Sequence, residues 1–162
     1  MIFHFSISSD TPAATAAALA EILGGTAMPF PPVGIDSWIA ISGDGHGTAI
    51  EVYARGWRIE PGEQDAPAVG RFDEKSERFG PVHFAVGTSL DEAEVRAIAA
   101  REGWRATYDK RGNVFGVIEL WVDNALMIEV LTAEMQAEYL GAMNVQNWAK
   151  MLAAADDSRL AA

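Results

Sequence analysis

Two histidines and two glutamates recur at matching places in this sequence of 162 residues. His4 lies in a short apolar run near the start of the chain, and His83 lies in a second run of the same kind, at residues 81–86. A glutamate follows each histidine inside a later apolar run, Glu51 after His4 and Glu129 after His83. The two spacings are nearly equal, 51 − 4 = 47 and 129 − 83 = 46 residues. Similarity at a fixed period indicates a duplicated module.

The alternation of side chains predicts that these four residues share a face of their strands. In each run, the aromatic and β-branched residues alternate with the titratable one, so the two sets point to opposite sides of a sheet. Neutral imidazole and carboxylate are ligands that a divalent Zn, Ni, Co, Mn or Fe ion accepts. The pattern predicts His4, Glu51, His83 and Glu129 as metal ligands. The alternative is a duplicated fold in which they are solvated strand residues that bind metal weakly or not at all.

The hydrophobic periodicity predicts the same order of elements in both halves, a strand, a helix and three further strands. We expect an α+β fold in which two tandem βαβββ modules form a curled mixed sheet around a cavity. A C-terminal helix follows them. The expected boundaries are 1–55 for the first module, 56–80 for a linker, 81–132 for the second module and 133–162 for the C-terminal helix and tail. Ser89 is expected to cap the helix of the second module.

Three further residues are candidates for binding a substrate. Tyr53 and Arg55 alternate with the apolar residues on the same face of the strand as Glu51, and Trp121 lies in the strand before Glu129. Arg55 is expected to hold an anionic group of a substrate, with a role as an ordinary surface arginine as the alternative. The two aromatic residues are expected to line the pocket.

Composition excludes several classes of partner. The formal net charge is −11, with 12 Lys and Arg against 23 Asp and Glu, whereas nucleic acids and anionic membranes bind basic faces. No apolar run is long enough for a membrane helix, and the start of the chain lacks the features of a secretory signal. There are no cysteines, so any metal site uses nitrogen and oxygen ligands. We expect a cytoplasmic protein whose partner is a small molecule.

The paired modules, with histidine on each first strand and an acidic residue on each last strand, resemble the vicinal oxygen chelate superfamily. This superfamily includes glyoxalase I, methylmalonyl-CoA epimerase, extradiol dioxygenases and the fosfomycin and bleomycin resistance proteins. The resemblance covers about residues 2–132, and His4, Glu51, His83 and Glu129 match the ligand pattern of bacterial glyoxalase I. It implies a homodimer, because members often complete their cavities across subunits. Residues 10–18 lack the aromatic pair and the arginine typical of glutathione-using members.

The resemblance implies a divalent-metal-dependent, glyoxalase-like lyase or isomerase. The reaction would transfer a proton next to a carbonyl group of a small oxygenated substrate, with Glu129 or Glu51 as the base. Two alternatives stay open. One is an Fe(II) extradiol-type dioxygenase that uses His4, His83 and Glu129. The other is a metal-free binding or resistance protein of the same fold, with Tyr53 and Trp121 against the ligand.

Overall fold

The computed structural model describes residues 3–30, 36–60, 68–75, 77–79, 82–143, 146–147 and 150. The first module comprises β1 (His4–Ser9), α1 (Pro12–Leu23), β2 (Thr26–Pro29), β3 (Trp38–Ile41) and β4 (Ala49–Ala54). Its four strands form one sheet in the order β1-β4-β3-β2. β1 runs parallel to β4, and the other neighbours are antiparallel. The first half of the chain therefore has the predicted βαβββ order.

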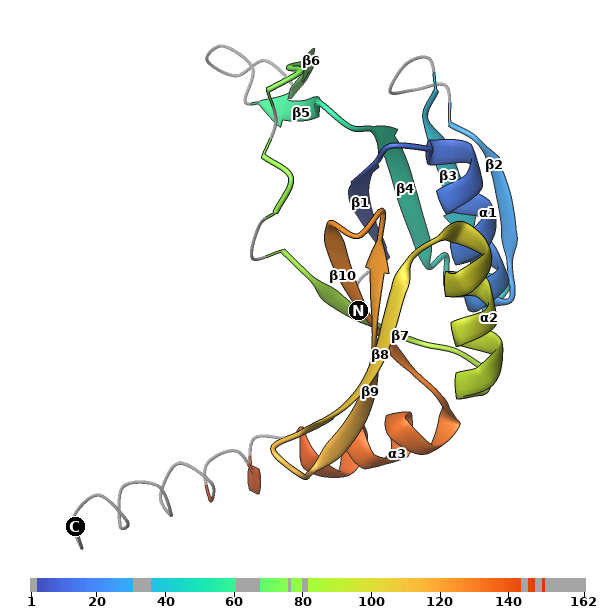
Figure 1. The fold of residues 1–162 in the computed structure, drawn as a ribbon, viewed down its shortest axis with the longest axis vertical. Helices are drawn as coiled ribbons and strands as arrows, with labels where there is room; N and C mark the ends of the chain where they lie inside the picture. Colours follow the sequence, from blue (N-terminus) through green and yellow to red (C-terminus); the bar gives the residue numbers. More distant parts are fainter. Residues whose placement is uncertain are drawn as a thin grey trace, which may run out of the picture.

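The second module repeats this arrangement. It comprises β7 (Phe84–Gly87), α2 (Glu92–Glu102), β8 (Arg105–Arg111), β9 (Phe115–Val122) and β10 (Leu126–Leu131). The strand order is β7-β10-β9-β8, again with the first strand parallel to the last. The predicted α+β fold with two βαβββ modules is confirmed. Each module has its own four-stranded mixed sheet, and Figure 1 shows the two sheets one above the other.

The registers of the two modules agree at the residues that carry the predicted chemistry. Ser6 pairs with Glu51 across β1 and β4, and Ala85 pairs with Glu129 across β7 and β10. Each histidine precedes its glutamate's strand partner by two residues, so Glu51 and Glu129 occupy equivalent places. Because side chains two residues apart share a face, this register matches the duplication that the sequence predicted.

The helices begin and end at identifiable residues. In α2 the side chain of Asp91 accepts from the backbone N–H of Glu94, whose own side chain accepts from the backbone of Asp91. This reciprocal capping box corrects the expectation that Ser89 caps the helix, since Asp91 stands next to the first turn. Both α1 and α2 end at a glycine with positive φ, Gly24 and Gly103.

Two elements lie outside the modules. β5 (Trp57–Glu60) and β6 (Val69–Phe72) form an antiparallel two-stranded sheet in the predicted linker, at the top of Figure 1. α3 (Ala133–Ala142) begins the predicted C-terminal helix, and most of the expected remainder falls outside the described residues. None of the described helices is long and apolar enough to cross a membrane.

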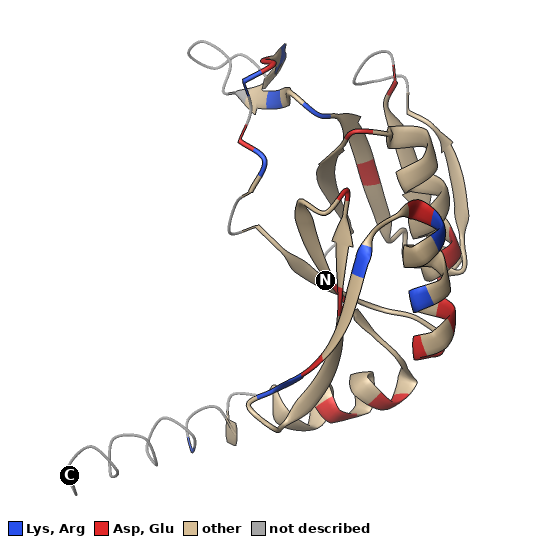
Figure 2. Cartoon of the chain, in the orientation of Figure 1, with Lys and Arg blue, Asp and Glu red and all other residues tan. Residues whose placement is uncertain are grey.

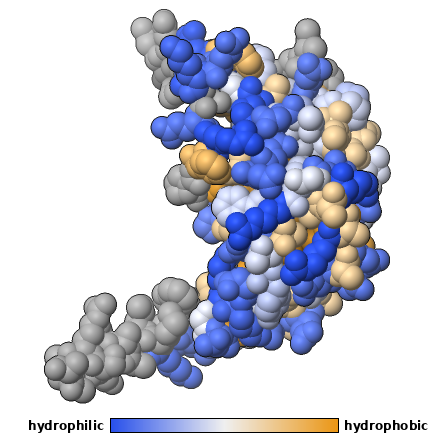
Figure 3. Space-filling model, in the orientation of Figure 1, coloured by the Kyte–Doolittle hydropathy of each residue, from blue (hydrophilic) through white to orange (hydrophobic). Residues whose placement is uncertain are grey.

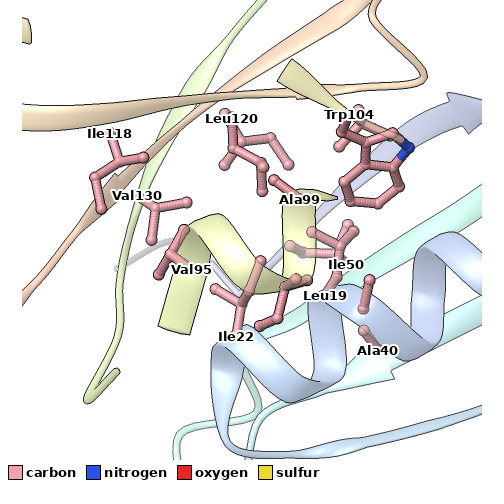
Figure 4. Close-up of a cluster of buried hydrophobic side chains, with 14 of the residues drawn as sticks. Leu19, Ile22, Ala40, Ile50, Val95, Ala99, Trp104, Ile118, Leu120 and Val130 are labelled. Atoms are coloured by element: carbon pink, nitrogen blue, oxygen red, sulfur yellow. The ribbon is translucent and has the colours of Figure 1, made fainter. Parts of the chain in front are cut away.

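One hydrophobic core joins the two modules. Leu19 and Ile22 of α1 pack with side chains from the inner face of the first sheet, and the same cluster continues into α2 and the second sheet (Figure 4). Ile50, Ile118, Leu120 and Val130 are at most 1% exposed. The rings of Phe5 and Phe84 stack with their centroids 4.6 Å apart, which brings β1 and β7 together. Burial of these side chains is the main force that fixes the modules against each other.

Candidate functional site

The candidate site lies on the face of the two sheets that points away from α1 and α2, here called the open face. The opposite faces carry the core residues Ile50, Val52, Ile128 and Val130, all nearly inaccessible to solvent. Strand alternation therefore places Glu51 and Glu129 on the open face. Figure 2 shows acidic positions on sheets and helices alike, and Figure 3 shows a mainly hydrophilic surface with separate hydrophobic patches.

Glu51 is held by neutral hydroxyl groups from its own module. Ser6 donates a hydrogen bond of 2.8 Å to Glu51 Oε2, and the Tyr53 hydroxyl donates to the same oxygen. The other oxygen, Oε1, lies 3.9 Å from His4 Nε2. The Glu51 side chain is 13% exposed and the His4 side chain is 58% exposed. The result is a nearly buried carboxylate with one oxygen fixed and the other directed at an imidazole.

Tyr53, predicted to contact a substrate, lies behind Glu51 instead of standing free in solvent. The residue is 6% exposed. Burial, together with the hydrogen bond to Glu51, raises the pKa of the Tyr53 hydroxyl above its ordinary value, so this group stays a donor at neutral pH. Its position indicates that it orients the carboxylate. Whether it also contacts a ligand stays a prediction.

Glu129 has a cationic partner. Arg111 donates to Glu129 Oε1 from Nε at 3.1 Å and from Nη2 at 2.7 Å. The same Nη2 donates to Glu119 at 2.7 Å, and Nη1 donates to Asp109 at 2.6 Å. Glu119 lies directly opposite Glu129 across β9 and β10. The second module therefore carries an arginine that holds two facing carboxylates, with a third carboxylate at its edge.

The four predicted metal ligands do not meet in one place among the described residues. His4 and Glu51 come together, whereas Glu129 is engaged by Arg111 and His83 lies exposed just before β7. Within the described part of the chain, no group of three or more histidine, aspartate or glutamate side chains lies close enough to hold one metal ion. As a set of four, these residues therefore do not fit a single ion in one copy of the chain.

Arg55 belongs to a network that joins the modules. It forms ion pairs with Asp10 at the end of β1 and, at 3.0 Å, with Asp123 in the turn between β9 and β10. Asp123 also accepts from the backbone N–H of Asp10 at 2.6 Å, and Arg78 donates to the Asp123 carbonyl at 2.6 Å. The Asp123 side chain is 7% exposed. These contacts give Arg55 a structural role, and its predicted contact with a substrate anion stays untested.

Trp121 stands on the open face two residues after Glu119. Its indole Nε1 is buried and has no hydrogen-bond partner among the described residues. A buried donor without a partner is costly, so a ligand or water that accepts from it would be favoured. The predicted contact of Trp121 with a ligand stays a prediction.

A hollow of about 850 Å³ lies between the modules, on the side of the aromatic stack. Phe5, Ile50 and Phe84 line it, together with Gln136 and Tyr139 of α3. Neither Glu51 nor Glu129 borders it. This cleft is separate from the carboxylates of the open face.

Comparison with solved structures identifies the fold. The fosfomycin resistance protein FosX from Mesorhizobium loti superposes with a TM-score of 0.51 and 10% identity, over 86% of this chain and 97% of that one. A lactoylglutathione lyase from Agrobacterium tumefaciens gives 0.50 and 13%, over 83% and 94%. The chain has the vicinal oxygen chelate fold. The resemblance that the sequence predicted is thereby confirmed at the level of fold.

At these identities the likeness establishes the fold alone, because one fold carries many chemistries. No family model matches the sequence, and no curated protein matches it either. The function must therefore be argued from the residues of the vicinal oxygen chelate framework in this chain.

Proposed function

We propose that this vicinal oxygen chelate protein is a glyoxalase-like lyase or isomerase. It would bind a small oxygenated substrate on the open face, and Glu51 would transfer a proton at the carbon next to a carbonyl group. The observation that carries the proposal is the setting of Glu51. Its Oε2 is fixed by Ser6 and Tyr53, while Oε1 points toward His4. A positioned carboxylate base contributes roughly 10²- to 10⁴-fold to such a step.

The choice between the two predicted bases follows from their hydrogen-bond partners. A base needs a carboxylate oxygen that the substrate can reach, and an oxygen that already accepts two hydrogen bonds from a guanidinium is occupied. Among the described residues, the hydrogen bonds to Glu51 come from the hydroxyl groups of Ser6 and Tyr53, whereas Glu129 accepts two from Arg111. Glu51 is thus the better candidate for the base. Glu129 would then position Arg111 or contact the substrate.

The proposal includes a divalent metal ion bound by His4 and Glu51 of the first module. His4 and Glu51 supply one imidazole and one carboxylate 3.9 Å apart, a donor pair suited to Ni, Zn, Co, Mn or Fe. A divalent cation bound there would polarise the oxygens of a substrate as a Lewis acid. His83 and Glu129 of a second copy offer a way to complete the ligand set, and the homodimer implied by the resemblance is proposed on the same ground.

Proton exchange with solvent tests the proposed chemistry without knowledge of the product. Small 2-oxoaldehydes and α-hydroxy ketones are incubated in D₂O with the metal-supplemented protein, and deuterium incorporation beside the carbonyl is followed by NMR. The protein is expected to catalyse exchange, and Glu51→Gln is expected to reduce it at least a hundredfold. Glu134→Gln, which alters an exposed glutamate of α3, is the matched control. Unchanged exchange in Glu51→Gln would refute the role of Glu51.

A metal-free binding protein is the second candidate, and Arg111 favours it. The guanidinium already supplies positive charge beside Glu129 on the open face, where the sequence predicted a metal ion. Trp121, with its unpartnered indole N–H, and Tyr53 would then serve recognition of the ligand. Elemental analysis of protein purified without chelator or nickel resin, beside the His4→Ala/His83→Ala variant, separates the two. About one equivalent of metal that the variant lacks supports the enzyme, and metal-independent ligand binding supports the alternative.

A further inference from the structure

The arginine of the second module occupies an unusual place for a surface cation. Arg111 is the last residue of β8, and three of its nitrogens donate to three different carboxylates. Its side chain is 33% exposed, while those of Glu129 and Glu119 are 13% and 19% exposed. A guanidinium keeps its charge throughout the ordinary pH range, so Arg111 is a permanent cation beside these glutamates.

The sheet itself makes a cation necessary at this point. Glu119 and Glu129 are direct cross-strand neighbours, and like charges in that relation destabilise a sheet. Both side chains are mostly buried, which increases their repulsion and the cost of removing them from water. A positive charge between them offsets both effects. In this chain that charge comes from Arg111.

The first module provides an internal comparison. Ile39 pairs with Glu51 in the same way as Glu119 pairs with Glu129, so the first module has one carboxylate where the second has two. The hydrogen-bond donors to Glu51 are the hydroxyls of Ser6 and Tyr53. The equivalent glutamates of the two modules therefore differ in their hydrogen-bond donors, which are hydroxyl groups at Glu51 and a guanidinium at Glu129. In the described part of the chain, the arginine that contacts these glutamates belongs to the second module.

We propose that Arg111 is a built-in counter-ion that competes with divalent cations for Glu129. The guanidinium must leave Glu129 Oε1, to which it donates twice, before that oxygen can coordinate a metal ion. Arg111 thereby lowers the metal affinity of the second module, whereas the described hydrogen-bond donors to Glu51 in the first module are hydroxyl groups. This inference rests on the proposed function only in assuming that metal reaches the open face.

Calorimetric titration with Mn²⁺, a cation that prefers oxygen ligands, tests the competition. The background is a His4→Ala/Glu51→Gln protein, in which the first module contributes no ligand. In this background, Arg111→Met is expected to bind Mn²⁺ at least tenfold more tightly than the protein with Arg111, because charge-assisted hydrogen bonds no longer hold the carboxylates. The added affinity is expected to disappear when Glu129→Gln is introduced as well.

Lys110→Met is the matched control. Lys110 is the neighbouring residue of β8, points to the other face and pairs with Glu138 of α3, so its loss changes the net charge by the same amount. Its Mn²⁺ affinity is expected to equal that of the background. Arg111→Lys keeps the charge but loses the planar fork, and an intermediate affinity is expected. It also serves as the test protein if Arg111→Met fails to fold, as judged by circular dichroism.

The outcomes separate this inference from the proposed function. Equal Mn²⁺ affinity with and without Arg111, or an equal gain in Lys110→Met, would overturn the competition and leave the role of Glu51 intact. Loss of solvent exchange through Glu51→Gln is measured in the protein that retains Arg111, so its result does not depend on Mn²⁺ binding to Glu129. A gain confined to the Arg111 variants and dependent on Glu129 would establish the counter-ion.

Discussion

Glu51 and Glu129 hold the same register position in the two modules, each on the last strand of its module and opposite the residue that comes two after the histidine. Their partners nevertheless differ in charge, with hydroxyls of Ser6 and Tyr53 on Glu51 and the guanidinium of Arg111 on Glu129. Duplication supplied two equivalent carboxylates, and their neighbours gave them different chemistry. Oε2 of Glu51 accepts from two hydroxyl groups, whereas Oε1 of Glu129 accepts twice from one guanidinium.

Tyr53→Phe tests whether the hydroxyl orients Glu51. The substitution keeps the buried ring and removes the donor to Oε2, so the free energy of unfolding is expected to fall by about 1–2 kcal/mol. Deuterium exchange into the substrate is expected to slow about tenfold or more, because the base loses its fixed position. Urea titration and NMR measure the two effects. Tyr108→Phe, at an exposed position on β8, is the control, and an equal slowing there would contradict the assignment.

Arg55→Met is expected to loosen the junction between the modules. The variant leaves Asp123, whose side chain is nearly buried, without its guanidinium partner. An unpaired buried charge is costly, so we expect a loss of roughly 2–3 kcal/mol in the free energy of unfolding. Arg58→Met in β5, where the ion pair with Asp73 is half exposed, is the comparison and should cost less than about 1 kcal/mol. If the two substitutions lower the free energy of unfolding equally in urea titration, Arg55 does not stabilise the junction between the modules.

Two neighbouring glycines after α1 should respond differently to alanine. A Cβ at Gly25 would come within 1.9 Å of the carbonyl oxygen of Ile41, so backbone must move and we expect a loss of at least about 3 kcal/mol. Gly24 has φ of +63° and free space around it, so Gly24→Ala should cost only about 1–2 kcal/mol of backbone strain. Thermal unfolding of the two variants shows which substitution destabilises the protein more. A smaller effect at Gly25 would mean that β3 can shift away from the helix end.

Much of the fold follows from local pattern. Alternation of apolar and polar residues placed the strands around Glu51 and Glu129, and the equal spacing from His4 and His83 revealed the duplication. These signals depend only on neighbours in sequence, so they can be extracted before any tertiary contact is known. The same alternation also identified the open face on which the glutamates lie.

The partners of those glutamates could not be found in this way. Residues 110–113, Lys-Arg-Gly-Asn, have the composition of a turn, yet β8 extends to Arg111. Only the pairing of β8 with β9, and of β9 with β10, brings it to Glu119 and Glu129. The same holds for Asp123, whose partners Asp10 and Arg55 are 113 and 68 residues distant. Contacts at such separation leave no local period in the sequence.

Asp10 gives the junction between the modules a dependence on pH. The hydrogen bond from Arg55 holds the pKa of the Asp10 carboxyl below its ordinary value of about 3.9, so the folded protein binds fewer protons there than the unfolded chain does. Its contribution to stability is therefore fully present above that ordinary pKa and is lost as the pH falls through the lower folded pKa.

Asp10→Asn should be less stable than the parent at pH 7, and the difference should shrink steadily below about pH 4. Urea titrations at a series of pH values measure this difference. Asp91→Asn, which alters the capping residue of α2 away from the network, is the comparison, and a pH-independent difference for Asp10→Asn would show that its charge does not hold the junction.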